Sequence, residues 1–579
     1  MNHIDTFKGN TTLIAKYGMG DAHLIWVMGL YLDNSNLEEL ASECLTEGWG
    51  DKKIDFIKLD VDNKKIVFAQ GYYAKKKAGS APSNKASDLN TAAAWLFSGS
   101  LELISSPLKE IIADCRAAIQ ADEIEQIDIL YVHNLSESVS VERELKTVAN
   151  HLKSTLSTAT ISIEIISREL GLTNVEAMFD EQTSKILVKE KIECPAKLEF
   201  EITEENWSSG ILSIPGTWLR EQFLKYNDKL FSANYRGFLG IDRRRKINHG
   251  IKTTAEFQPK NFWAYNNGIT ILTQDYSSSN EKTILHGISI INGAQTTGSL
   301  GSLDINTDLS SVRVLARIIK CTDENTIESI IRFNNTQNKI TTWDKFSNDP
   351  IQKNIMEQFK SLNHNYSLKR GFSDQMGEIG IENVIQPLVA ILGNFAEANR
   401  GKNGLFDSDN SYKSAFENVH ARHILFVYCL NGAINERRNQ LKLKKEENTI
   451  IPIEEKQLTL LRSFKFKYFY VSIFGKCLEI LLNTKITSIK QVGFKEEFAQ
   501  KRNYPLNSLI VDLLPVVNLV LIHTSISVNG KDFTELLEEG GDSIDKIANQ
   551  VSGMLYASIY SGTNFDIERF RKIISYNIA

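Results

Sequence analysis

The sequence predicts a multidomain α/β protein, with an α/β domain at the amino terminus, a central α+β domain and a mainly helical carboxy-terminal region. The chain has 579 residues, which is more than a single hydrophobic core usually organises. Strand and helix patterns alternate along the first third of the chain, whereas the last part reads mainly as helices. We therefore expect domains over residues 1–190, 195–350 and 351–579.

The first expected domain is an α/β unit in which strands and helices follow one another. Strands are predicted where apolar and polar residues alternate, and helices where apolar residues recur every three or four positions. The predicted strands span residues 53–61, 64–73 and 127–134, and the predicted helices span residues 36–45, 86–97 and 141–152. Glu39 and Glu43 lie one turn apart on the first of these helices, where we expect both to be exposed.

Asp55 and Gln70 are the candidate metal ligands of this first domain. A turn at Asp62 and Asn63 separates the two strands that carry them, so the two side chains are expected to meet across a hairpin. Metal-dependent phosphodiester cleavage needs oxygen ligands for Mg²⁺ and a cation near the attacking water or the scissile phosphate. Tyr72 stands where that cation would follow on the strand, and Lys85, at the start of the next helix, is the candidate replacement.

The arrangement of an acid, a second acid or Gln, one residue and then Lys resembles the restriction-endonuclease-like, PD-(D/E)xK nuclease fold. The resemblance covers roughly residues 30–100 and departs from the pattern at Tyr72. It implies a catalytic set of Asp55, Gln70 and Lys85, with Mg²⁺ as the cofactor. The alternative interpretation is structural: Asp55 neighbours a turn, Gln70 is a satisfied core amide and the lysines of residues 75–77 are solvated.

Four amide-rich blocks stand out in the central region, each beside an apolar run. They are NYRGFLG from Asn234, FWAYNNGIT from Phe262, IINGAQTT from Ile290 and RFNNTQNKI from Arg332. Buried amides need hydrogen-bond partners to offset their desolvation, which indicates a polar site. In this order the blocks resemble the AIPR family, named for abortive infection and phage resistance. The resemblance implies a bacterial antiphage defence protein and carries no defined mechanism.

The blocks also predict local structure. Residues 262–270 read as a strand in which Trp263, Tyr265 and Asn267 share one face, and Gly293 predicts a turn from strand to helix with N–H groups free for an anion. A later helix has an apolar stripe through Ile330 that continues into asparagines. The candidate ligand-binding residues are Asn234, Arg236, Tyr265, Asn266, Asn267, Asn292, Gln295, Thr296, Asn334, Asn335 and Asn338.

A basic run over residues 243–252 follows Arg236 and lies beside several aromatic residues, a combination that suits phosphate contacts and base stacking. Nucleic acid, with DNA favoured, is therefore the expected partner, together with a phage trigger or a partner defence subunit. The alternative is that Arg236 bridges a buried carboxylate, the asparagines cap helices and the basic run is solvated.

The overall composition limits the remaining possibilities. The chain has 66 basic and 71 acidic residues, for a formal charge of −5, which argues against a general polyanion binder but not against a local basic groove. Its 6 cysteines show no metal-binding spacing, so buried reduced thiols are expected. No signal-like start or long apolar run is apparent, and we expect a cytoplasmic protein that does not enter the membrane.

Two functions remain open from the sequence. The first is a metal-dependent nuclease whose AIPR domain recognises or controls access to nucleic acid. The alternative is a catalytically inactive sensor or binding module for nucleic acid, a nucleotide or a protein, in which Tyr72 marks lost catalysis. The sequence does not decide the oligomeric state.

Overall fold

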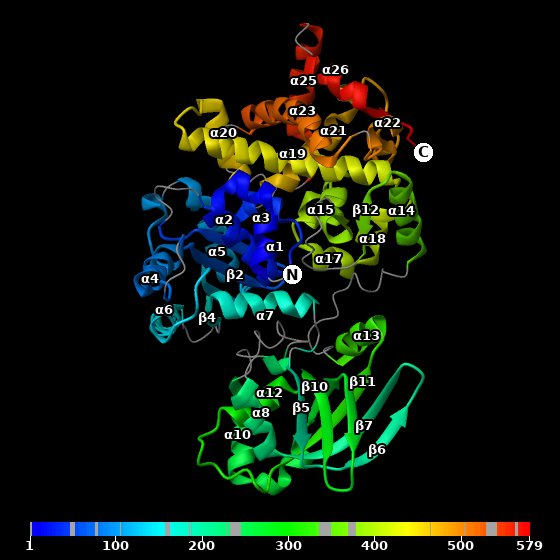
Figure 1. Ribbon diagram of the computed structural model, residues 1–579. Helices are drawn as coiled ribbons and strands as arrows, with labels where there is room; N and C mark the ends of the chain where they lie inside the picture. The colour runs from blue at the N-terminus through cyan, green and yellow to red at the C-terminus, as the bar shows by residue number, and fades with distance from the viewer. Residues whose placement is uncertain are drawn as a thin grey trace. The chain divides into compact units, whose positions relative to one another are not determined.

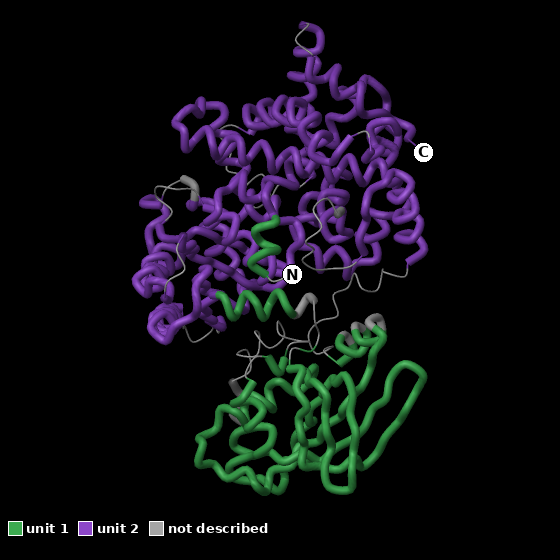
Figure 2. Tube along the Cα trace, viewed as in Figure 1, with its two compact units in different colours: residues 1–9, 172–340 green, residues 10–171, 341–579 purple. Residues whose placement is uncertain are grey.

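The computed structural model describes residues 3–46, 52–75, 79–104, 106–156, 163–183, 186, 188–226, 229–231, 245–334, 349–368, 378–463, 465–502, 504–528, 541–561 and 565–578. Two compact units divide the chain (Figure 2). One consists of residues 1–9 and 172–340, and the other of residues 10–171 and 341–579. The first and the last thirds of the sequence therefore fold together. The expectation of a mixed α/β chain with a helical carboxy-terminal region is confirmed.

The amino-terminal part of the larger unit (Figure 1) is built on a four-stranded sheet. Its strands lie in the order β1-β2-β3-β4. β1 and β2 form an antiparallel hairpin, and β3 and β4 add in parallel after helical crossovers. The elements are α2 (Thr11–Leu32), α3 (Leu37–Cys44), β1 (Phe56–Asp60), β2 (Lys65–Tyr72), α4 (Ser83–Phe97), η1 (Leu101–Leu103), α5 (Ser106–Gln120), β3 (Gln126–His133), α6 (Val139–Leu156) and β4 (Glu164–Leu170). All six elements predicted from sequence periodicity are confirmed.

Alternation along the strands separates the two faces of this sheet. On β2, Ile66 and Phe68 belong to the core that includes α4, α5 and α6, while Gly71 faces Leu24 of α2 on the other side. The hairpin turn is closed by Asn63, whose backbone N–H and side-chain amide both donate to Asp60. The sheet is therefore covered on both faces, as its parallel strands require.

The carboxy-terminal part of the same unit is a helical assembly around one large apolar core. Its main helices are α14 (Pro350–Ser361), α15 (Ile381–Ile391), α16 (Phe395–Ala398), α17 (Lys402–Asp407), α18 (Asp409–Phe416), α19 (Ala421–Glu446), α20 (Pro452–Arg462), α21 (Phe466–Leu482), α22 (Glu496–Ala499), α23 (Leu506–Ser527), α25 (Gly541–Tyr560) and α26 (Phe565–Ile573). The short strands pair as β12 (Asn365–Ser367) with β13 (Glu378–Gly380) and as β14 (Val492–Phe494) with β15 (Ile574–Tyr576), and η6 (Ile489–Gln491) precedes β14.

Among the described residues, α23 is the one helix whose length and apolar composition would allow it to cross a membrane. It packs against α19 and α25, and Pro515 lies inside it. Its buried side chains, among them Leu509, Leu513 and Val520, recur at helical spacing. This pattern is typical of a helix that buries one face against neighbouring helices.

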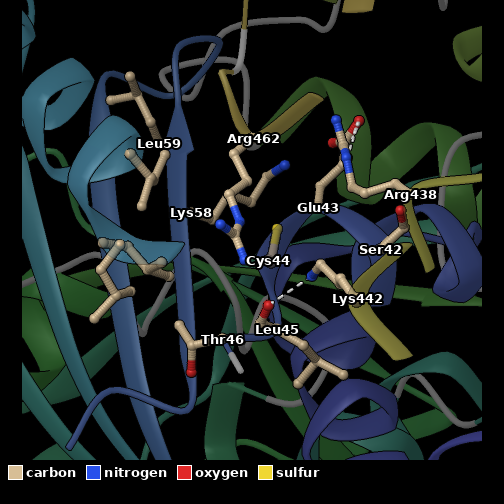
Figure 3. A pocket seen from close by; sticks show the side chains of 13 residues that line it. Ser42, Glu43, Cys44, Leu45, Thr46, Lys58, Leu59, Arg438, Lys442 and Arg462 are labelled. Atoms are coloured by element: carbon tan, nitrogen blue, oxygen red, sulfur yellow. Dashed lines mark hydrogen bonds and ion pairs between the residues drawn. The ribbon is translucent and has the colours of Figure 1, made fainter. Parts of the chain in front are cut away.

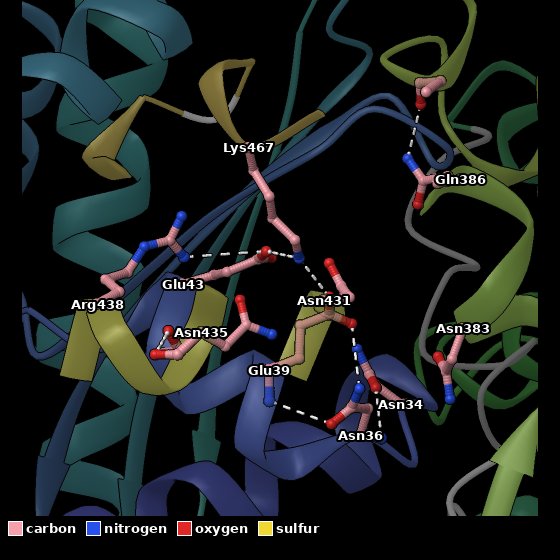
Figure 4. Close-up of polar contacts among 12 residues, drawn as sticks. Asn34, Asn36, Glu39, Glu43, Asn383, Gln386, Asn431, Asn435, Arg438 and Lys467 are labelled. Carbon is pink, nitrogen blue, oxygen red and sulfur yellow. Dashed lines mark hydrogen bonds and ion pairs between the residues drawn. The ribbon is translucent and has the colours of Figure 1, made fainter. Parts of the chain in front are cut away.

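A buried polar cluster joins the amino-terminal sheet region to these helices (Figure 4). Lys467 of α21 forms ion pairs with Glu39 and Glu43 of α3, the second over 2.7 Å. Asn431 of α19 also donates to Glu39, over 2.9 Å. The expectation that the two glutamates are exposed is wrong, because α3 turns them toward α19 and α21 rather than toward water.

The smaller unit contains a sheet whose main path runs β5-β10-β8-β11-β7-β6, with β9 pairing with β10. Its elements are α1 (His3–Gly9), α7 (Leu172–Thr183), β5 (Val188–Cys194), β6 (Leu198–Thr203), β7 (Trp207–Pro215), α8 (Gly216–Tyr226), α10 (Arg245–Phe257), η4 (Pro259–Asn261), α11 (Phe262–Tyr265), β8 (Ile269–Thr273), β9 (Asp275–Ser278), β10 (Thr283–Asn292), α12 (Ala294–Gly301), β11 (Arg313–Cys321) and α13 (Glu324–Asn334). The predicted strand over residues 262–270 is wrong in its first part: Phe262–Tyr265 form the short helix α11, and β8 begins only at Ile269.

The six cysteines are all free thiols and all buried, which confirms the sequence expectation.

Candidate functional site

A row of polar side chains crosses the amino-terminal sheet. The pairing of Phe56 with Ala69 places Asp55, just before β1, opposite Gln70 of β2. Gln70 is paired with Tyr131 of β3, and Tyr131 with Glu169 of β4. Because residues paired across neighbouring strands project from the same face, the four side chains lie on the face that α4 covers.

Most polar groups of this row have protein partners. Asp55 accepts a hydrogen bond of 2.8 Å from the backbone N–H of Gly71. The Tyr131 hydroxyl donates to the carbonyl of Pro82 over 3.3 Å. Glu169 lies 3.0 Å from Nε2 of the buried His133 and also accepts from the backbone N–H of Ser138. These bonds fix the orientation of the row.

The Gln70 amide is the exception. Its side chain is 2% exposed, and no hydrogen-bond donor reaches its Oε1 from the part of the chain that the structure describes. A buried carbonyl oxygen without a donor is costly, and native structures rarely keep one unless water, an ion or a ligand completes it. Within the described residues, the Gln70 amide thus lacks a donor for its oxygen.

Two lysines lie near this row. Lys85 is half-buried in the first turn of α4, three residues after Pro82. Lys53, two residues before Asp55, forms an ion pair of 3.6 Å with Asp88 of the same helix. Tyr72 is paired with His133 and packs partly against the apolar core.

Sequence reasoning missed Lys53 and Asp88. One signal was available, since Asp88 follows Lys85 by three residues on a predicted helix and thus lies on the same side of it. The position of Lys53 needed the structure. Burial raises the pKa of the Tyr131 hydroxyl, and the charges of Tyr72, Glu169, Asp55 and Asp88 raise it further.

The donor set is compatible with Mg²⁺. Asp55 and Gln70 supply a carboxylate and an amide oxygen on facing strand positions, and both are ligand types that Mg²⁺ accepts. No three His, Cys, Asp or Glu side chains converge on a metal position within the described ranges. Mg²⁺ commonly binds through one or two protein oxygens and completes its shell with water and substrate phosphates.

A second polar row crosses the sheet of the smaller unit. Asn292 of β10 is paired with Thr270 of β8, which is paired with Arg317 of β11. Asn334, at the end of α13, covers this row: its backbone carbonyl accepts from Asn292 over 2.7 Å, and its side-chain oxygen accepts from Arg317. The side-chain nitrogen of Asn334 donates to the carbonyl of Ile330 over 2.8 Å.

The helix that carries Asn334 follows the predicted pattern. Ile327, Ile330 and Ile331 of α13 pack against the apolar face beside the row. The polar end of the stripe is confirmed at Asn334, whereas Asn335 and Asn338 lie outside the described residues.

Two glycines bring the loops of this site together. Gly268 and Gly293 have φ angles of +77° and +88°. A Cβ atom on Gly293 would lie 2.7 Å from the carbonyl oxygen of Gly268, so the two backbones approach as only glycine allows. The predicted strand-to-helix turn at Gly293 is confirmed, because β10 ends at Asn292 and α12 starts at Ala294.

The remaining candidate residues differ in their surroundings. Asn266 accepts from the backbone N–H of Gly268 over 2.9 Å and from the hydroxyl of the buried Thr296 over 3.2 Å. Tyr265 and Asn267 are exposed, and Gln295 is half-buried. Asn234 and Arg236 lie outside the described residues.

The comparisons with known proteins agree with the central blocks. The family model described as AIPR protein matches residues 231–501, and this match supports the AIPR family. The matched stretch includes Asn292, Gln295 and Asn334, and extends through α14 to α22 of the helical region. No curated protein and no solved structure matches the chain.

Proposed function

We propose that the chain is a bacterial antiphage defence protein that acts through abortive infection, and that its amino-terminal sheet is a Mg²⁺-dependent nuclease. The AIPR match over residues 231–501 suggests the role in abortive infection and phage resistance. The nuclease assignment rests on one observation above the others: within the described parts of the chain no donor reaches Oε1 of Gln70, which lies in a polar row that also contains Asp55.

In this proposal Asp55 and Gln70 hold Mg²⁺, which supplies charge stabilisation to the scissile phosphate. The hydrogen bond from Gly71 keeps the Asp55 carboxylate oriented, and the bond from Tyr131 to Pro82 holds the start of α4 over the row. Lys85 orients the attacking water from the first turn of that helix. Lys53 is the second cation available, and it approaches α4 at Asp88.

The central domain is proposed to recognise nucleic acid or another phosphate-containing ligand and to control access to the nuclease. Its contact surface consists of the exposed Trp263 and Tyr265, the amides of Asn267 and Gln295, and the start of α12. Exposed aromatic rings next to amides suit base stacking with polar contacts. Arg236 and the basic run that follows it would add phosphate contacts. We infer action in the cytoplasm, on DNA in the first instance.

The test is cleavage of plasmid DNA, single-stranded DNA and RNA by purified full-length protein with Mg²⁺ or Mn²⁺. Asp55→Asn is expected to lower the rate by a factor of about 10² or more, because it removes the charge that holds the metal. If Lys85 acts on the attacking water, Lys85→Ala is expected to lower the cleavage rate at unchanged substrate affinity. If Lys53 acts on it instead, Lys53→Ala is expected to have this effect. Glu125→Gln, at the other end of the same sheet, and Lys109→Ala, exposed on α5, are the matched controls.

A second function, an inactive sensor or binding module, is favoured by Tyr72 at the position where the nuclease pattern has lysine. It predicts nucleic-acid or nucleotide binding without turnover, with binding weakened by Arg236→Ala and unaffected by Asp55→Asn. Cleavage that needs no metal, or that survives Asp55→Asn, would refute the nuclease proposal.

A further inference from the structure

A cavity of about 60 Å³ lies in the larger unit, where α3, β1 and α5 meet α19 and α20 (Figure 3). Four basic side chains line it: Lys58 of β1, Arg438 and Lys442 of α19, and Arg462 at the end of α20. Among the residues that the structure describes, Glu43 is the one carboxylate that lines it. None of these residues belongs to the polar row around Asp55 or to the central amide set.

Among the described lining residues, basic side chains outnumber acidic ones. Glu43 already accepts an ion pair of 2.7 Å from Lys467 and lies 3.9 Å from Nη1 of Arg438. Cys44 adds no negative charge near pH 7, because burial raises the pKa of its thiol to about 12. Lys442 also donates to the carbonyl of Leu45 over 3.0 Å. The described lining thus carries more basic than acidic side chains in a partly buried position, where charges are poorly screened by solvent.

Arg438 is the clearest indication that the cavity binds an anion. Its side chain is only 5% exposed, and its Nε–H has no acceptor within the described parts of the chain. Burying a guanidinium without an acceptor for each N–H is unfavourable. An anion in the cavity would accept from it, as oxyanions commonly accept from arginine.

The volume of the cavity limits the size of the anion that it can hold. One water needs about 10–15 Å³ by this measure, so a space of about 60 Å³ holds about four waters, or one tetrahedral oxyanion. Guanidinium and ammonium groups together are the usual recognition set for phosphate, since arginine donates in a planar fork and lysine acts as a point charge.

We propose that this cavity binds a phosphate group, held by Lys58, Arg438, Lys442 and Arg462. Its occupant bridges the amino-terminal sheet region and the helical region, because the four cations come from β1, α19 and α20. Bound phosphate is therefore expected to tighten the packing between these two parts of the larger unit. The proposal does not depend on nuclease activity, and the site is separate from the one at Gln70.

The first experiment measures phosphate binding to the full-length chain by calorimetry, and melting in sodium phosphate against sodium chloride of equal ionic strength. Phosphate is expected to raise Tm by about 2 °C or more over chloride, as a ligand specific to the native state does. Arg462→Gln and Lys58→Gln are expected to weaken phosphate binding at least tenfold. Lys456→Gln removes an exposed charge from the same helix as Arg462 and is expected to bind like the wild type.

The source of the phosphate group is decided by two further ligands, adenosine monophosphate and a 5′-phosphorylated oligonucleotide. Tighter binding of either, in competition with inorganic phosphate, identifies a terminal phosphate on a larger molecule. Equal or weaker binding identifies the free anion. Both results uphold the site if Arg462→Gln weakens them and Lys456→Gln does not.

Folding of the variants is checked by melting in chloride alone. Removing one of several like charges is expected to leave Tm unchanged or slightly higher, so a loss that appears only in phosphate reports on the ligand. The proposal is overturned if phosphate stabilises no more than chloride and neither larger ligand binds. It is equally overturned if Lys456→Gln weakens binding as much as Arg462→Gln does.

Discussion

The two units bury polar groups in different ways. In the larger unit the buried polar groups include many ionisable side chains, such as Lys467, which pairs with Glu39, and His133, which pairs with Glu169. In the central sheet the polar row is built of Asn292, Thr270 and Asn334, with Arg317 at its edge. Amides and hydroxyls keep one charge state at all pH values, whereas carboxylates and imidazoles do not. Charge state is thus a variable in the larger unit and nearly constant in the central row.

The largest expected effect comes from breaking the ionisable cluster. Lys467→Met removes the buried cation that pairs with both Glu39 and Glu43, and removing one partner of such a cluster costs about 3–5 kcal/mol. The free energy of unfolding from urea titration measures this loss. Lys476→Met, on the same helix but in an exposed ion pair with Asp545, is the control and is expected to cost less than about 1 kcal/mol. Equal losses in the two variants would mean that the buried cluster contributes no more than a surface pair.

The second expected difference between the units is the pH dependence of their free energies of unfolding. Burial lowers the pKa of His423 from 6.5 to about 4 in the folded chain. The unfolded imidazole therefore takes up a proton before the folded one does, and stability falls as pH drops from about 6.5 toward about 4, by about 3 kcal/mol for this residue. Burial also lowers the pKa values of His364, His420 and His523, so they act in the same direction.

At lower pH, protonation of Glu39 also lowers the stability of the larger unit. Lys467 and Lys402, opposing the effect of burial, hold the pKa of Glu39 at about 2, below its usual 4.5. The stabilisation that the ionised Glu39 carboxylate contributes is complete above pH 4.5 and is lost as pH falls toward 2. Hydrogen exchange, corrected for intrinsic rates, measures the two units separately. Peptides from α19 report on the larger unit, and peptides from β10 report on the smaller unit. A His423→Gln variant that keeps the wild-type loss between pH 6.5 and 4 would refute the assignment to this histidine.

In the central unit, backbone geometry rather than charge is expected to matter most. Gly293→Ala places a Cβ atom 2.5 Å from Cγ2 of Ile269 at a φ angle of +88°. We expect a loss of about 2–3 kcal/mol in the free energy of unfolding of this unit, because both strain and overlap must be relieved. Gly298→Ala, in the helix that Gly293 precedes and with no atom within 4 Å of the added Cβ, is expected to be neutral or to stabilise by up to about 1 kcal/mol. The comparison fails if the two substitutions have similar effects.

The sequence predicted those parts of the fold that local periodicity determines. The β1–β2 hairpin, α4, α6 and the apolar stripe of α13 all follow from the spacing of apolar residues within each segment. Residues 262–265 were misjudged because three aromatic residues favour a strand. The chain instead enters by the turn of η4, buries Phe262 and leaves Trp263 and Tyr265 exposed, which a single helical turn achieves.

The candidate sites were predicted only where their members are close in sequence. Asp55 and Gln70 belong to one hairpin, so turn geometry places them opposite each other. Glu39 and Lys467 are 428 positions apart, and no pattern within either segment indicates the other. The basic cavity could not be predicted for the same reason, since Lys58 and Arg462 come from parts of the chain that only the folded unit brings together.

The smallest expected effect on stability concerns Arg317, the one charged member of the central row. Its side chain is exposed and donates to Asn334 and, over 3.4 Å, to Thr270. Arg317→Met is expected to lower the free energy of unfolding by less than about 1 kcal/mol, since water replaces these bonds in the variant. If the row is a recognition surface, the same change weakens binding of a fluorescent oligonucleotide about tenfold, a loss typical of one phosphate contact at moderate salt. Arg313→Met, exposed on the same strand and the same face, is the control. A large loss of stability with unchanged binding would instead show that the amides and Arg317 serve to fasten α13 to the sheet, and the two units would then differ in how they fold rather than in what they bind.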